Sequence, residues 1–287
     1  MNALRRDCAP TASGPAAAAI GRAATLALHD ELALAPKPGL VSFVDTGSHD
    51  DMDAHSFMRS LFALRSYFVG ITELGAAQAP FGELEACGVA AERRMLAATG
   101  GVNTHRGAVF LLGLLCAAAG ALQAEGQSLT ATALRKALRS RWGEALAARC
   151  ARPSCLPGGI AARRFGLRSA SQEAALGFPV LFETVVPAWG AARTQGLAGE
   201  RLRLQVFFAT LAVLDDSNLA HRGGLDGLRW ARQRARHFLA RGGAARSDAL
   251  GEAWAIHREF VARRLSPGGC ADLLAAACWL HRLGVLR

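Results

Sequence analysis

Residues 105–124 read HRGAVFLLGLLCAAAGALQA, the most apolar helix-length stretch of this 287-residue chain. Its apolar run, residues 108–122, is shorter than the roughly 20 residues that a membrane span needs. The whole chain is 51% hydrophobic, and aromatic and β-branched residues are sparse among its many alanines, leucines and arginines. Helix propensity therefore exceeds strand propensity almost throughout. We expect an all-α protein with a substantial buried core.

Before and after this stretch, helical periodicity predicts further helices, most of which have Gly, Pro or Asn near their ends. The expected helices cover residues 15–34, 54–75, 82–98, 105–124, 130–148, 170–192, 199–214, 224–241, 247–263 and 269–284. Prolines at 36 and 38 end the first helix, because proline lacks an amide donor, and a loop over 37–53 follows. Residues 152–159 are rich in Pro and Gly and predict a long loop or hinge. Composition does not shift across them, so we expect one globular domain over residues 15–287, preceded by a flexible arm of residues 1–14.

The charge balance limits the partners of the chain. The 33 Lys and Arg against 23 Asp and Glu give a formal charge of +10, which attracts polyanions such as nucleic acid, an acidic membrane or a phosphorylated metabolite. Nearly all of these cations are arginine, so the nucleotide composition of the gene also explains the positive charge. Few aromatic residues and no recognisable binding module argue against nucleic acid, which we keep only as a rival.

Cysteine usage and the N-terminus indicate the compartment. The seven cysteines form no CxxC pair and have no histidine spacing suited to zinc. Their odd number argues against a closed disulfide framework, so we expect buried thiols in a reducing compartment. No signal peptide is apparent at the N-terminus. We therefore expect a cytoplasmic protein without a membrane partner.

Polar residues gather near the ends of the predicted helices, and the first cluster lies in the loop over 37–53. It contains Lys37 and Ser42, followed by His49, Asp51 and Asp53. Carboxylate oxygens suit magnesium, so the two aspartates are candidate metal ligands. The alternative is that they cap the next helix and complement its dipole.

A second cluster precedes the apolar helix and contains Asn103, Thr104, His105 and Arg106. A helix N-terminus with these side chains suits phosphate. The alternative is a glycine turn with Asn or Thr as the N-cap. The glycine spacing is not that of a Walker loop, and no GxGxxG motif follows a predicted strand.

A third cluster follows the predicted helix 199–214 and contains Asp215, Asp216, Asn218 and Arg222. Two acids at the C-terminal end of a helix oppose its dipole, which favours a metal or substrate role over plain solvation.

A fourth cluster contains Ser266 and Asp272 on either side of a Pro-Gly-Gly turn, and by itself it reads as an ordinary helix start. Glu173 is a weaker candidate, because an acid early in a helix is commonly a capping residue.

Taken in this order, the clusters resemble the signature of the triphosphoribosyl-dephospho-CoA synthases. The matching pieces are PKPGLV at 36–41, GSH at 47–49 with DMD at 51–53, NTH at 103–105 with Gly107, EA at 173–174 with GFP at 177–179, Asp216 and Asn218 with RGG at 222–224, and SPGG at 266–269 with ADLL at 271–274. The chain departs from the family pattern at Arg106, Ser217 and Cys270, where lysine, threonine and serine are usual, and Asp50 adds an acid at a variable position. Arginine keeps the phosphate-binding charge of lysine, although its fork is planar.

The resemblance implies an enzyme that uses ATP and 3′-dephospho-CoA as substrates. The ribose 2′-hydroxyl of dephospho-CoA attacks C1′ of the ATP ribose, adenine leaves, and the triphosphate stays attached. The product is the prosthetic-group precursor of the acyl carrier protein of malonate decarboxylase or citrate lyase. Such glycosyl transfer through an oxocarbenium-like transition state needs a carboxylate and a proton donor for the leaving group.

The resemblance also suggests roles for the clustered residues. Magnesium binding or general base chemistry is expected of Asp51, Asp53, Glu173 and Asp216, and catalysis of His49, Asp51, His105 and Asp216. Substrate binding is expected of Lys37, Ser42, Asn103, Thr104, Arg106, Asn218, Arg222, Ser266 and Asp272, with Lys37, Arg106 and Arg222 on the triphosphate. Exchange of Asp51 or Asp216 for Asn is then expected to nearly abolish adenine release and leave the fold intact.

Three alternatives stay open at this point. An ADP-ribosyl or nucleoside hydrolase shares the chemistry at ribosyl C1′ and the acidic residues. The stand-alone form and the length favour the malonate pathway slightly over the citrate pathway. A homodimer is compatible with the sequence, which does not specify the oligomeric state.

Overall fold

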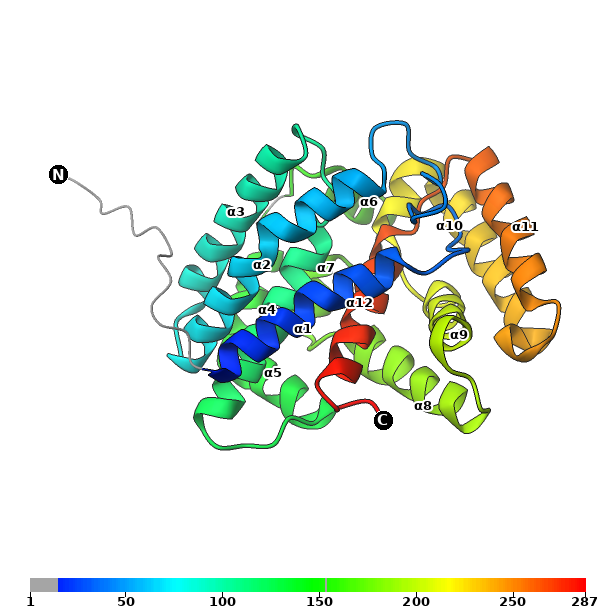
Figure 1. Cartoon of the computed structure of the whole chain (residues 1–287). Coiled ribbons are helices and arrows are strands. Elements are labelled where there is room, and N and C mark those ends of the chain that lie inside the picture. Colours follow the sequence, from blue (N-terminus) through cyan, green and yellow to red (C-terminus); the bar gives the residue numbers. More distant parts are fainter. Residues whose placement is uncertain (1–14, 153) are drawn as a thin grey trace.

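The computed structural model describes residues 15–152 and 154–287, which form helices and no strand (Figure 1). The all-α prediction is confirmed, and the predicted arm, residues 1–14, lies outside the described residues. The α-helices are α1 (Pro15–Leu32), α2 (Ala54–Ala76), α3 (Phe81–Ala98), α4 (Arg106–Ala124), α5 (Ala131–Cys150), α6 (Pro157–Phe165), α7 (Ala170–Ala175), α8 (Val186–Thr194), α9 (Gly199–Leu211), α10 (Ser217–Ala240), α11 (Ala249–Ala262) and α12 (Gly268–Arg282). A π-helical turn, η1 (Leu181–Val185), precedes α8, and a 3-10 turn, η2 (Gly243–Ala245), follows α10.

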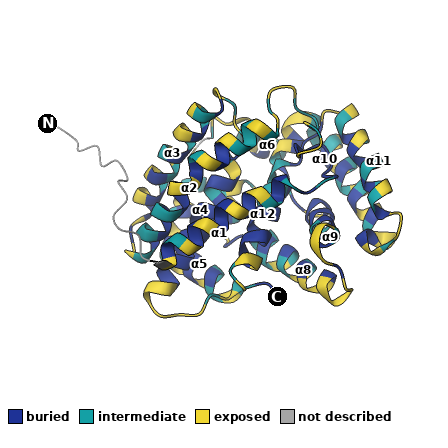
Figure 2. Ribbon diagram, viewed as in Figure 1, coloured by how far each residue is buried: buried dark blue, intermediate teal, exposed yellow. Residues whose placement is uncertain are grey.

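Helix α4 is the centre of the first group of helices, where it packs against α1, α2, α3, α5 and α12. Every residue from 108 to 122 is buried except Phe110. By length and hydropathy α4 would suffice to cross a membrane, but 78% of its apolar window is buried inside the protein. Figure 2 shows buried residues along α4 and along the inner faces of the helices around it. Its apolar composition is therefore that of a core helix.

Glycines let α2 and α4 approach closely. A Cβ at Gly75 would lie 2.0 Å from the carbonyl oxygen of Ala117, and a Cβ at Gly120 would lie 2.1 Å from that of Thr72. No larger residue fits at either position without separating the two helices. The Tyr67 hydroxyl also donates to the Val109 carbonyl at 2.8 Å. The start of α4 is thereby held firmly against α2.

Helix α12 joins this first group to a second group. It packs against α1 and α4 on one side and against α9, α10 and η1 on the other. Residues 273–280 are all buried. Its first turn meets the start of α4 at Gly107 and the start of α10 at Asp216. The N-terminal ends of three helices from distant parts of the sequence therefore lie together.

Two of the predicted elements, the loop over 152–159 and the helix over 170–192, are wrong. The predicted loop over 152–159 instead ends in α6, which begins with Pro157 in its first turn and ends at Gly166 in a left-handed conformation (φ 63°). Proline in the first turn and glycine just past the last are favourable helix ends. The predicted helix 170–192 is interrupted, because Gly177 and Phe178 adopt positive φ values of 74° and 49° and Pro179 follows. The chain therefore forms α7, η1 and α8 in its place.

Helix α10 begins seven residues before the predicted start at 224. The reason is a kink: Gly224 has φ 64° and ψ −166°, so the first part of α10 and the predicted part are two helical segments. The remaining predicted helices are confirmed to within a few residues at each end.

Candidate functional site

Four helices direct their N-terminal ends into one cleft with a volume of ≈ 1120 Å³. Its lining includes residues 106–108 of α4, 157–159 of α6, 217 and 218 of α10, and 268 and 269 of α12. First-turn amides and the positive end of a helix dipole favour anions. No side chain caps α6, and its residues Gly158 and Gly159 line the cleft. The fold therefore gathers four helix N-termini at a single cleft.

Most of the residues predicted for the site line this cleft. They are His49, Asp51, Asn103, Thr104, His105, Arg106, Asn218, Arg222, Ser266 and Asp272. They come from four clusters that are up to 223 positions apart in the sequence, since the first is at 49 and the last at 272. The structure thus gathers the motif clusters on one surface, as a site on loops at helix ends requires.

Lys37 and Ser42 do not line the cleft. Lys37 is 1% exposed, and its ammonium group donates to the Glu31 carbonyl oxygen at 2.7 Å and forms a buried ion pair with the Glu31 carboxylate. Burial raises the pKa of Glu31 and lowers that of Lys37, and the attraction between the pair opposes both shifts. The hydroxyl of Ser42 accepts from the Val44 amide at 3.1 Å inside its own turn. Lys37 therefore neutralises Glu31, which itself reaches the cleft.

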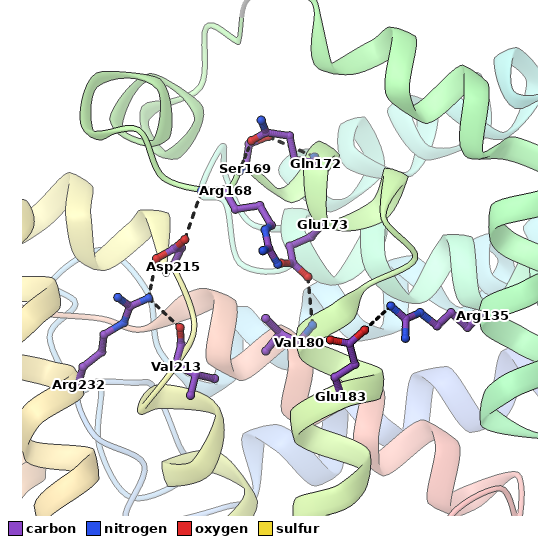
Figure 3. A network of polar contacts seen from close by, with 10 residues as sticks. All are labelled: Arg135, Arg168, Ser169, Gln172, Glu173, Val180, Glu183, Val213, Asp215 and Arg232. Carbon is purple, nitrogen blue, oxygen red and sulfur yellow. Dashed lines mark hydrogen bonds and ion pairs between the residues drawn. The ribbon is translucent and has the colours of Figure 1, made fainter.

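Asp53 and Glu173 also lie outside the cleft lining. Asp53 is the N-cap of α2 and accepts from the Ser56 amide at 2.8 Å, a hydrogen bond that lowers its pKa. Glu173 pairs with Arg168 at 2.7 Å and accepts from the Val180 amide at 3.3 Å, as Figure 3 shows. Asp53 therefore follows the capping alternative. Glu173 is held by its ion pair with Arg168, whereas Ser169 and Gln172 form the capping box of α7.

The two acids after α9 have different surroundings. Asp215 pairs with Arg232 at 2.5 Å, and the same guanidinium donates to the Val213 carbonyl (Figure 3). This arginine compensates both the acid and the negative end of α9. Asp216 is 1% exposed and is the N-cap of α10, where it accepts from the amides of Asn218 and Leu219. Its second oxygen accepts from the Cys270 amide of α12 at 3.1 Å.

The four predicted metal ligands are therefore not gathered. Asp51 lies at the cleft, Asp53 and Asp216 cap helices, and Glu173 is paired with Arg168. Within residues 15–152 and 154–287, no three His, Cys, Asp or Glu side chains converge as metal ligands. These residues do not fit a magnesium site built by the protein alone.

His49 is held in one tautomer on the cleft wall. Arg222 donates to its Nδ1 at 3.1 Å, and its Nε2 lies 2.9 Å from the Ser266 hydroxyl. Because Nδ1 must accept, Nε2 carries the proton and donates to Ser266. Burial, followed by the nearby Arg222 charge, lowers the pKa of His49, although Asp51 at 3.5 Å opposes this shift. A neutral His49 therefore orders the loop over 47–51 against α10.

His105 and Thr104 leave two buried polar atoms without partners at the cleft. His105 is 4% exposed, and its Nδ1 is 2.7 Å from the Ser60 hydroxyl. Its Nε2 and the Thr104 hydroxyl are buried with no hydrogen-bond partner among the described residues. Unsatisfied buried polar atoms cost free energy unless a ligand or water pairs them. The two atoms therefore mark a place where a polar ligand group fits.

The pKa of His105 gives a stability prediction. Burial, assisted by the Lys37 charge, lowers this pKa to about 3 from an ordinary 6.5. As pH falls through 6.5 the unfolded chain takes up a proton at this position and the folded chain does not, so stability falls with pH. Between pH 7 and about pH 5, urea unfolding should show a loss of up to about 2 kcal/mol from this group. In H105Q this part of the loss should vanish, whereas S60A should retain it; identical pH dependence in wild type and H105Q would contradict the assignment.

Asp272 is a residue of α12 that lines the cleft, and its carboxylate reaches the start of α4. The Ala108 amide donates to its carboxylate, and a Cβ added at Gly107 would lie 1.9 Å from its Oδ2. Only glycine leaves room for this carboxylate at the helix start. Burial, followed by the charges of Glu31 and Asp216, raises the pKa of Asp272 well above its ordinary value. A carboxylate with a raised pKa is a stronger base than an ordinary aspartate.

Sequence reasoning missed part of the cleft lining. The missed charged residues are Glu31, Glu85, Glu92, Arg149, Arg152 and Arg163. They lie inside predicted helices or near the supposed loop over 152–159, and they carry no local motif. In an arginine-rich chain their role depends on tertiary contacts that the sequence does not display.

Comparisons with known proteins identify the family of the chain. The family described as ATP:dephospho-CoA triphosphoribosyl transferase matches residues 17–287. A probable 2-(5''-triphosphoribosyl)-3'-dephosphocoenzyme-A synthase of Acinetobacter calcoaceticus is 35% identical over 260 residues, which cover 91% of this chain and 89% of the relative. A protein of the same description from Vibrio cholerae serotype O1 (strain M66-2) is 35% identical over 276 residues, covering 92% and 88%. No solved structure matches the chain. The chain therefore belongs to the triphosphoribosyl-dephospho-CoA synthase family of transferases.

Proposed function

We propose that this chain transfers the triphosphoribosyl group of ATP to the ribose 2′-hydroxyl of 3′-dephospho-CoA and releases adenine. The observation that carries the proposal is the cleft, where four helix N-termini and several arginines surround a floor carboxylate and two unpartnered buried polar atoms. Anionic walls would repel both substrates, whereas these walls favour polyphosphates. Family membership supports the same reaction.

In the proposed mechanism Asp272 is the general base. It accepts the proton of the 2′-hydroxyl as the 2′-oxygen bonds to C1′ of the ATP ribose. The bond between C1′ and the adenine nitrogen breaks, its electron pair leaves with adenine, and the departing base takes up a proton from water, while Asp272 later returns its proton to the solvent. Before it takes up the hydroxyl proton, the ionised carboxylate also stabilises the positive charge that develops on the ribose. Asp51, with a side chain that is 62% exposed at the rim, is the weaker candidate for this role.

His105 and Thr104 are assigned to the leaving base. When Ser60 donates to Nδ1 of the neutral His105, Nε2 carries a proton that has no acceptor among the described residues. That N–H and the Thr104 hydroxyl can donate to adenine as it acquires negative charge. A neutral imidazole is the suitable form, because burial keeps the pKa of His105 at about 3.

Arg106 is assigned to the triphosphate. Its Nε donates to Glu92 at 3.0 Å, which leaves both terminal nitrogens without a described partner. Arg222 contributes less directly, because it already donates to the carbonyls of Ser48 and Arg264. We propose that magnesium enters as the counter-ion of the ATP triphosphate, and that the protein supplies arginines and amides to this group.

The test is incubation of the protein with ATP and magnesium, with and without 3′-dephospho-CoA. We expect adenine only with the acceptor, and mass spectrometry should find the sum of both substrates minus adenine. Adenine released without the acceptor would indicate a ribosyl hydrolase, and no adenine in either case would refute the transferase proposal.

The pathway and the compartment belong to the same proposal. We propose that the product serves the acyl carrier protein of malonate decarboxylase, with citrate lyase as the alternative, in the cytoplasm. Purified apo-carrier proteins of the two kinds, offered the product and the enzyme that attaches it, distinguish the pathways by which carrier gains mass.

A further inference from the structure

The mechanism leaves one wall of the cleft unused. This wall is formed by the end of α5 and by α6, and it presents Arg149, Arg152 and Arg163 to the cleft. Glu85 of α3 lies beside these arginines and pairs with both Arg149 and Arg152 at 2.9 Å. Burial alone would raise the pKa of Glu85, but its hydrogen bonds to these two arginines lower the pKa below its ordinary value. Glu85 therefore stays ionised. Three guanidinium groups against one carboxylate leave an excess of positive charge.

Arg149 is held in place before any ligand arrives. Its Nε donates to Glu85, its Nη1 donates to Ser171 at 2.5 Å, and its guanidinium lies 5.2 Å from the centre of the Phe110 ring. Phe110 is also the residue of the apolar run 108–122 that is not buried. Fixing an arginine in advance lowers the entropy cost of binding an anion. The Nη2 group has no partner among the described residues and is free to donate.

Arg149 and Arg106 are each held by an ion pair with a glutamate of α3. Glu85 and Glu92, both on α3, each accept from the Nε of one of these arginines. The two acids are seven residues apart, which places them on the same face of α3 about 10 Å apart along its axis. Two separate guanidinium groups therefore face the cleft, one beside the start of α4 and one beside the end of α5.

We propose that Arg149, with Arg152 and Arg163 beside it, binds the diphosphate of the acceptor 3′-dephospho-CoA, apart from the triphosphate of ATP at Arg106. This inference rests on the proposed function. The acceptor diphosphate is carried on the 5′ carbon of the ribose whose 2′-hydroxyl attacks, and the triphosphate on the 5′ carbon of the other ribose. The reaction therefore requires two anion subsites flanking the reacting atoms, and separate arginines keep the like charges apart.

The test compares R149A with R135A. Arg135 lies on the same helix and is also paired with a glutamate, Glu183 at 2.5 Å, but it does not line the cleft. In R149A we expect the KM for dephospho-CoA to rise about tenfold or more, and the KM for ATP to stay within about twofold. R149K should be intermediate, because an ammonium cannot reproduce the fork that joins Glu85 and Ser171. A higher KM for ATP in place of dephospho-CoA, or no change in R149A, would overturn the proposal.

Calorimetric titration with 3′-dephospho-CoA, without ATP, separates this inference from the proposed function. Binding that R149A weakens and R135A retains supports the subsite even if the wild type releases no adenine. Equal binding by wild type and R149A refutes the subsite even if the wild type makes the expected product. Wild-type protein that binds no dephospho-CoA refutes both.

Discussion

Exchange of Asp272 for Asn is expected to lower the rate constant for adenine release by about 10²- to 10⁴-fold, the usual contribution of a general base. Asparagine has nearly the same shape and can still accept from the Ala108 amide at the start of α4. It cannot accept the proton of the attacking hydroxyl. Single-turnover measurement of adenine release, with both substrates saturating, isolates this step from binding.

A matched control for D272N is E173Q, which removes the charge of an acid that lies outside the cleft lining. E173Q should retain activity within a few-fold. A wild-type rate in D272N would contradict the base assignment and turn attention to Asp51. Equal losses in D272N and E173Q would indicate a general effect of lost negative charge.

The surroundings of Asp272 also predict the pH dependence. A general base must be ionised, and burial with the neighbouring Glu31 and Asp216 charges raises the pKa of Asp272. The acid limb of the profile of kcat/KM should therefore lie at higher pH than an ordinary aspartate would give. In D272N the residual activity should lose this limb.

The sequence predicts most helices because their ends carry local signals. The prolines at 36 and 38 end α1, and Asp53 and Thr130 cap α2 and α5 with their side chains. The sequence prediction fails at α6, although Pro157 at its start and Gly166 after its end are local signals of the same kind. The helices were thus readable from local chemistry, including those that were missed.

The cleft was only partly predictable. The motif residues cluster near helix starts, so local sequence finds Asn103, His105, Asn218 and Ser266. Local sequence does not reveal whether an acid at a helix end turns toward its own helix or toward a ligand. Contacts between distant segments decide that, as when Arg232 reaches Asp215 across 17 positions. The arginine wall at Arg149 depends entirely on such contacts.

The burial of Asp216 changes the effect that we expect its substitution to have on the stability of the protein. Its carboxylate accepts from the first turns of both α10 and α12, and burial raises its pKa despite these backbone hydrogen bonds. In D216A three amides lose their acceptor, so we expect the free energy of unfolding to fall by about 3 kcal/mol or more. D216N keeps one oxygen and should lose less. Urea denaturation measures both losses.

The same variants distinguish a structural Asp216 from a metal ligand. If Asp216 ties the two helix starts together, D216A should lose stability equally with and without magnesium, and D216N should recover activity under conditions that keep it folded. D53A removes an exposed cap of α2 and should destabilise the chain less than D216A does. If Asp216 binds magnesium, D216N should remain as stable as the wild type and stay inactive at every temperature at which it is folded. Stability and activity that fall together in D216A, with both largely restored in D216N, would assign Asp216 to holding α10 and α12 at the cleft.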